Sequence, residues 1–153
     1  MLLMSEINTS TYKEHLEKYG TLTYRNVGIS MMPLLKQGRD IFTVTKKTSE
    51  RCKKYDVVLY KRPPQQFVLH RVIKVRENDY VILGDNCINK EYGITDNDII
   101  GVMTEFVRKG KKITVNDRIY RLYSFIWVNF SGVRIFLQKL KFKIKSIFKK
   151  NKS

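Results

Sequence analysis

The stretch FVLHRVIKVRENDYVILGDN, residues 67–86, holds two apolar, β-branched runs on either side of a charged turn. Residues 67–75 and 79–83 have the composition of strands, and Glu77-Asn78-Asp79 supplies a hairpin loop. Short strands separated by turn residues predict a mainly β domain, a partly coiled barrel or a sandwich. Similar runs recur along the chain: TLTYRNV at 21–27, DIFTVTK at 40–46, DVVLY at 56–60, IIGVMTEFV at 99–107 and KKITV at 111–115.

Helical patterns stand at both ends of this β region. Residues 11–19 predict a short helix that ends at Gly20. After Asp117, apolar residues recur at steps of three and four, which predicts a helix, and the run NFSG at 129–132 could kink or split it. We therefore expect an N-terminal helix in residues 1–20, a β domain in 21–116 and a basic amphipathic helical tail in 117–153.

The composition is that of a globular protein with a basic appendage. Hydrophobic residues make up 42% of the chain, which argues against a disordered protein. The formal net charge is +16, and residues 111–153 contribute 12 Lys and Arg against one acid, Asp117. The opening MLLMSEINTSTYKEH predicts no signal peptide, and no run of 18 apolar residues predicts a spanning helix.

The tail predicts contact with an acidic partner, either anionic lipid or nucleic acid. Its apolar stripe ends among lysines, and Tyr120, Tyr123 and Trp127 suit a membrane interface. We favour a helix that lies in the plane of an anionic leaflet, which makes the protein peripheral to the membrane. The cytoplasmic face is preferred, because Lys-rich segments are enriched on that side of membranes. The alternative is that the apolar face packs back on the β domain.

Ser30, in GISMMPLLKQG at 28–38, is a candidate nucleophile because a histidine could act as its base. His70 lies in a strand-like run, and an imidazole with an ordinary pKa of about 6.5 can take a proton near neutrality. On a period of two, His70 shares a face with Val68 and Val72, so it could equally be a core residue. The other histidine, His15, is expected at the surface.

A downstream carboxylate could orient the imidazole. Asp85 lies in the run ILGDNC, and Glu91, Asp96 and Asp98 follow it. A carboxylate from this segment could fix the tautomer and stabilise the imidazolium. Gly-Asp-Asn after a strand is also a common turn, and Glu91 could be a solvated loop acid.

Taken in order, five short motifs resemble the boxes of type I signal peptidases. They are SMMP at 30–33, YDVV at 55–58, HRV at 70–72, GDN at 84–86 and IIGVM at 99–103. They are most similar to the endoplasmic-reticulum-type branch, which uses Ser–His where most bacterial enzymes and LexA-type self-cleaving repressors use Ser–Lys. The resemblance covers about residues 23–107. It implies a signal-peptidase/LexA-like coiled β-barrel.

The resemblance also implies roles for individual residues. Ser30 is the nucleophile, His70 the base, Glu91 the orienting acid and Asp85 a supporting acid. The substrate is a signal or leader peptide, bound extended along a strand edge with small residues one and three positions before the cut. Residues near the nucleophile could line its pockets or belong to the core: Met31, Met32, Pro33, Leu34 and Leu35. We expect no metal and no cofactor.

The chain departs from the family pattern at four points. Tyr55 replaces the usual Gly of its box, and Glu91 replaces an Asp. Gly28 stands where some members carry a serine, which leaves the Ser30 N–H as the expected oxyanion donor. The N-terminal membrane anchor typical of signal peptidases is not expected here.

Two other function classes compete with a leader-cleaving peptidase. One is a nucleic-acid-associated or self-cleaving repressor-type module, although too few residues precede the β domain for a helix-turn-helix and no Lys stands at the base position. Nucleic acid is therefore an unlikely partner. The other is a catalytically silent scaffold of the same fold.

Overall fold

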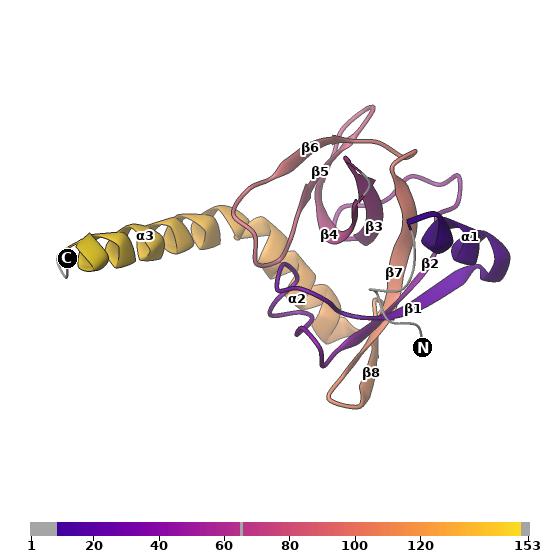
Figure 1. Ribbon diagram of the computed structural model, residues 1–153, viewed down its shortest axis with the longest axis horizontal. Helices are drawn as coiled ribbons and strands as arrows, with labels where there is room; N and C mark the ends of the chain where they lie inside the picture. The colour runs from indigo at the N-terminus through magenta and orange to yellow at the C-terminus, as the bar shows by residue number, and fades with distance from the viewer. Residues whose placement is uncertain (1–8, 65, 151–153) are drawn as a thin grey trace.

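The computed structural model describes residues 9–64 and 66–150 (Figure 1). Over these residues the chain forms a mainly antiparallel β-sheet with three helices, which confirms the mainly β prediction. The helices are α1 (Thr9–Tyr19), α2 (Arg118–Asn129) and α3 (Ser131–Lys150). The strands are β1 (Thr21–Arg25), β2 (Ile41–Lys46), β3 (Val57–Arg62), β4 (Gln66–Val75), β5 (Tyr80–Leu83), β6 (Glu91–Ile94), β7 (Ile99–Arg108) and β8 (Lys111–Thr114).

The strands are hydrogen-bonded in the order β1-β2-β7-β3-β4-β5-β6. β7 pairs with three strands. β2 runs along one of its edges, and β3 and β8 pair with the first and second halves of its other edge. Within the described residues, β1 and β6 end the path without pairing with each other, so the sheet is not closed. The hairpin expected between residues 67–75 and 79–83 is present as β4 and β5.

Two hydrophobic clusters lie on the two faces of β3. Val57 and Leu59 join the first cluster, and Val58 and Tyr60 join the second. Successive side chains of a strand point to opposite faces, so a strand covered on both sides is apolar throughout. α1 covers the first cluster through Tyr12 and Leu16.

β6 is a strand that the sequence pattern did not predict. Its four residues, EYGI, contain a charge and a glycine, and its Gly93 has φ +74°. Glycine and charged residues are depleted in strands, so this segment lacks the apolar, β-branched pattern by which the other strands were predicted. β6 forms because it pairs with β5 at the edge of the sheet, and this pairing fixes the backbone of Glu91.

The C-terminal helix breaks where the NFSG run predicted. α2 begins after Asp117, whose carboxylate caps it by accepting from the backbone N–H groups of Ile119 and Tyr120. It ends at Asn129, and α3 begins two residues later. α2 packs on the sheet through Tyr120, Ser124 and Val128, whereas α3 projects away from the body (Figure 1). No helix in the described part of the chain is both long and apolar enough to cross a membrane.

Candidate active site

Ser30 lies in a tight turn after β1. Asn26 is buried and braces this turn, because its side-chain amide donates to the carbonyl oxygens of Gly28 and Leu35. Gly28 has φ +87°, a backbone conformation that favours glycine and explains why no serine hydroxyl stands there. Among the described residues, the Ser30 N–H donates no hydrogen bond, so it is available to an oxyanion.

His70 lies on β4 with only 5% of its surface exposed. Its Nδ1 is 2.9 Å from Glu91 Oε1 and 3.3 Å from the Tyr60 hydroxyl. A carboxylate accepts but does not donate, so this contact favours the tautomer with the proton on Nδ1. The other nitrogen, Nε2, then carries the lone pair and can accept a hydrogen bond.

Burial lowers the pKa of His70 below its ordinary value of 6.5, and the charge of Glu91 opposes that shift. The imidazole is therefore neutral at pH 7, the state a general base requires. Arg62 Nη1 is 3.4 Å from the same Glu91 oxygen. Glu91 thus stands between a histidine and an arginine rather than free in solvent.

The serine turn and the imidazole meet at Gly84. A β-carbon at this position would lie 2.8 Å from His70 Nε2, 2.8 Å from the Ser30 carbonyl oxygen and 2.6 Å from Cys87 Sγ. Ser30, His70 and Cys87 also line one cavity of about 320 Å³. Among the described residues, no hydrogen bond joins the Ser30 hydroxyl to His70, and the hydrogen-bond partner of Nε2 is Cys87 Sγ at 4.0 Å.

Asp85 and Glu91 lie on opposite faces of β4, because Asp85 contacts Arg71 and Glu91 contacts the neighbouring His70. Asp85 is 1% exposed and forms a two-pronged ion pair with buried Arg71, both contacts being 2.8 Å. The Tyr123 hydroxyl donates to it at 2.8 Å, and Arg71 also donates to Ser124. Asp85 therefore joins β4 to α2, whereas Glu91 is the acid that contacts the imidazole.

The residues after Ser30 divide between the core and the surface. Met31, Leu34 and Leu35 are buried in the first hydrophobic cluster, which is where the core alternative for these residues places them. Met32 is half-buried and Pro33 is exposed. The apolar wall of the cavity is formed instead by residues that sequence reasoning did not select: Val27, Phe42, Leu59, Phe67, Val68 and Leu69.

Three further site residues escaped the sequence reasoning: Tyr60, Asn86 and Cys87. Tyr60 lay in a predicted strand, and only its pairing partner on β4 could have indicated a place beside His70. Asn86 lay in the GDN motif, and its backbone N–H donates to the Ser30 carbonyl at 2.7 Å. In residues 9–64 and 66–150, no group of three His, Cys, Asp or Glu side chains is placed to hold a metal ion.

Comparison with known proteins found no relative of this chain. No protein-family model matches the chain, and no curated protein and no solved structure matches it either.

Proposed function

We propose that the chain is a serine endopeptidase of the signal-peptidase type, with the coiled β-barrel fold of that family. Ser30 is the nucleophile and His70 the base in this proposal. The observation that carries it is the 2.9 Å contact between His70 Nδ1 and Glu91, since it leaves Nε2 as an acceptor on the side of Gly84 where Ser30 lies. The shared cavity gives a substrate access to both groups.

The chemistry follows the general scheme for an activated serine. His70 Nε2 takes the proton from Ser30 Oγ as Oγ bonds to the scissile carbonyl carbon, and the Ser30 N–H stabilises the oxyanion. His70 returns the proton to the leaving amine, and a water activated by the same imidazole then hydrolyses the acyl-enzyme. Glu91 stabilises the imidazolium formed in each step. Free-enzyme hydrogen bonds are often long and tighten when substrate binds.

The substrate class in this proposal is a precursor peptide or protein with a signal or leader segment. Its extended backbone would add along a strand edge, with small side chains one and three positions before the cut. The cavity beside Ser30 supports apolar side chains at these positions, because Val27, Phe67 and Val68 line it.

A cleavage assay tests the proposal. The purified chain is incubated with synthetic leader peptides that carry alanine at both positions, and products are identified by mass spectrometry. We expect cleavage by the wild type and by Ser49→Ala, a control at an exposed serine, and none by Ser30→Ala. Absence of Ser30-dependent cleavage would favour the silent scaffold. Peptides trapped on Ser30→Ala would name the natural substrate.

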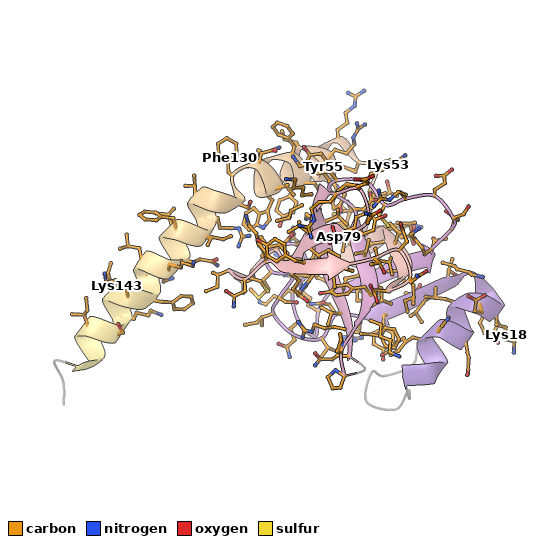
Figure 2. The ribbon with its side chains drawn as sticks, turned by 90° about the horizontal axis from the view of Figure 1, so that it is seen from above. Lys18, Lys53, Tyr55, Asp79, Phe130 and Lys143 are labelled. Atoms are coloured by element: carbon orange, nitrogen blue, oxygen red, sulfur yellow. The ribbon has the colours of Figure 1, made fainter. Side chains whose placement is uncertain are left out.

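We also propose that α3 lies in the plane of an anionic membrane surface, which makes the protein peripheral. One face of α3 is apolar and exposed, each side chain at least 43% so: Val133, Phe136, Leu137, Leu140, Ile144 and Ile147. These residues recur at steps of three and four, with Lys141 and Lys145 on one side of the stripe and Lys139 and Lys143 on the other. Figure 2 shows Lys143 on the projecting part of this helix.

Lysines beside an apolar stripe can place their ammonium groups among lipid phosphates while the stripe enters the interface. Each is worth about 1 kcal/mol near an anionic surface, and salt screens the attraction beyond about 8 Å. The lysines also favour the cytoplasmic leaflet.

Vesicle binding tests this second proposal. Replacing Lys139, Lys141, Lys143 and Lys145 together by Gln should weaken binding to phosphatidylglycerol vesicles, and salt should weaken wild-type binding. A matched variant removes four exposed lysines from the body and should bind almost normally: Lys53, Lys61, Lys74 and Lys90. Equal loss in both variants, or retention of a DNA fragment in preference to vesicles, would contradict the assignment to lipid.

A further inference from the structure

The loop Gly84–Cys87, here called the GDNC loop, contacts the backbone of the nucleophile turn. The Asn86 N–H donates to the Ser30 carbonyl at 2.7 Å, and the Asn86 side-chain amide donates to the Ile29 carbonyl at 3.2 Å. The loop also reaches the imidazole, because Cys87 Sγ is 4.0 Å from His70 Nε2. A shift of this loop would therefore move the serine relative to its base.

The opposite side of the GDNC loop is held by the C-terminal helices. Trp127 of α2 donates from Nε1 to the Asp85 carbonyl at 2.8 Å. From the start of α3, Arg134 Nη1 donates to the Cys87 carbonyl at 3.2 Å, and Gln138 Nε2 donates to Asn86 Oδ1 at 3.3 Å. Every residue from Asp85 to Cys87 thus has a hydrogen bond from α2 or α3.

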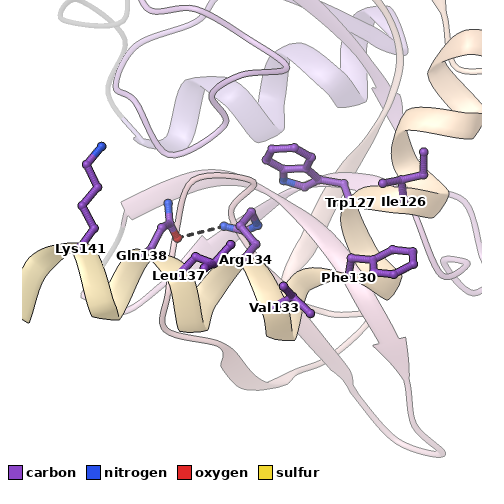
Figure 3. Close-up of a pocket in the computed structure, with 8 residues that line it drawn as sticks. All are labelled: Ile126, Trp127, Phe130, Val133, Arg134, Leu137, Gln138 and Lys141. Carbon is purple, nitrogen blue, oxygen red and sulfur yellow. Dashed lines mark hydrogen bonds between the residues drawn. The ribbon is translucent and has the colours of Figure 1, made fainter.

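Arg134 orients the glutamine that reaches Asn86. Its Nη1 donates to Gln138 Oε1 at 3.3 Å, the contact drawn as a dashed line in Figure 3. This leaves the Gln138 amide nitrogen directed to Asn86. The guanidinium also lies over the Trp127 ring, with its centre 5.3 Å from the ring centroid. Trp127 of α2 therefore forms one connected group with Arg134 and Gln138, which lie one turn apart on α3.

Arg134 is costly for a residue that only anchors a helix. It is partly buried and forms no ion pair with a carboxylate in the described part of the chain. Burial lowers its pKa, and its Nε is buried without a hydrogen-bond partner. A buried donor without a partner destabilises a fold, and an apolar side chain here would avoid that cost. The Arg134 guanidinium donates to the Cys87 carbonyl in the GDNC loop and to Gln138, which in turn donates to Asn86 of the same loop.

We propose that Gln138 and Arg134 are positioning residues, through which the first turns of α3 hold the GDNC loop against the Ser30 turn. The inference rests on the proposed function, because the loop positions Ser30 for that chemistry. It gives α3 two separate roles: Arg134 and Gln138 order the catalytic loop, while the apolar stripe and its flanking lysines meet the membrane.

Gln138→Glu tests the proposal with one atom exchanged. It keeps the acceptor for Arg134 and removes the donor to Asn86, so kcat for a soluble peptide should fall about tenfold with KM within about twofold. Arg134→Lys should do the same. Ser146→Glu adds the same charge at an exposed site on α3 and should leave both constants unchanged.

Hydrogen–deuterium exchange gives a second readout that does not need activity. In Gln138→Glu and Arg134→Lys, peptides covering residues 28–32 and 84–87 should exchange faster, while β3 and β7 keep their wild-type rates. Wild-type exchange in those segments, or a KM change with unaltered kcat, would overturn the positioning role. If the wild type has no Ser30-dependent cleavage, the proposed function fails, and exchange alone still decides whether α3 orders the loop.

Discussion

Two neighbouring residues of β4, His70 and Arg71, point to opposite faces of the strand, and each has its own carboxylate. On one face the imidazole meets Glu91 at the wall of a cavity, where a substrate can reach it. On the other face Arg71 and Asp85 form an ion pair with no solvent access, linked to α2 by Tyr123 and Ser124. The two pairs use similar chemistry, but they differ in exposure: Glu91 keeps 20% of its side-chain surface exposed, whereas Arg71 and Asp85 keep 1% each. This difference is why we propose a catalytic role for the first pair and a structural role for the second.

The largest effect should come from the His70 face. His70→Ala removes the proposed base and should lower peptide cleavage at least about 10³-fold, as Ser30→Ala should. The double variant should be no worse than either single one, because the two residues act as one unit. Circular dichroism should show an intact β domain in all three. If the activity losses of the two single variants were additive in the double variant, Ser30 and His70 would not act as a dyad.

The Arg71 face should respond in stability. Asp85→Asn leaves a buried guanidinium without its counter-charge, and losing one partner of such a pair costs about 3–5 kcal/mol. Chemical denaturation should report this loss, and Glu91→Gln should change the free energy of unfolding far less. If Asp85→Asn were as stable as the wild type yet inactive, Asp85 would belong to the chemistry instead.

Gly84 lies between the imidazole and the Ser30 turn and directly precedes Asp85 in the chain, so Gly84→Ala should affect both activity and stability. The new methyl group would lie within 2.8 Å of His70 Nε2 and of the Ser30 carbonyl. Overpacking of this kind costs about 1–3 kcal/mol, and it should also separate the base from the nucleophile. Gly132→Ala adds a methyl group in open space and serves as the control. Normal activity in Gly84→Ala would mean that the loop can move freely.

The smallest effect is a shift in pH dependence. The base must be neutral, so kcat/KM should fall as pH drops through the pKa of His70, with a midpoint below 6.5 because burial lowers that pKa. Glu91 raises the pKa, so Glu91→Gln should move the midpoint to still lower pH. It should also cost less activity than His70→Ala. A midpoint that moves upward would mean that Glu91 does not act on His70.

The sequence predicted the elements of the fold better than their contacts. Short β-branched or aromatic runs between turn residues indicated seven of the eight strands in the described residues, and NFSG indicated the break between α2 and α3. β6 was missed because its strand character comes from pairing with β5 and not from its own residues. Local patterns carry local structure, while edge strands depend on a partner elsewhere in the chain.

The site was predictable only to the level of candidates. Motif order selected Ser30, His70, Asp85 and Glu91, and the resemblance named Glu91 as the orienting acid, but the residues by themselves left the choice between the two acids open. That choice follows from β6 pairing and from burial of Arg71, both of which are tertiary. The same limit explains Met31, whose neighbours in the sequence suggested a pocket and whose neighbours in space are core residues.

The central claim is that His70 activates Ser30, and chemical labelling tests it most directly. The chain would be treated with a serine-directed phosphonylating probe and digested, and the modified residue identified by mass spectrometry. The account predicts a single adduct on Ser30 that is lost in His70→Ala and slowed in Glu91→Gln. No adduct, an adduct on Cys87, or undiminished labelling of Ser30 in His70→Ala would contradict it.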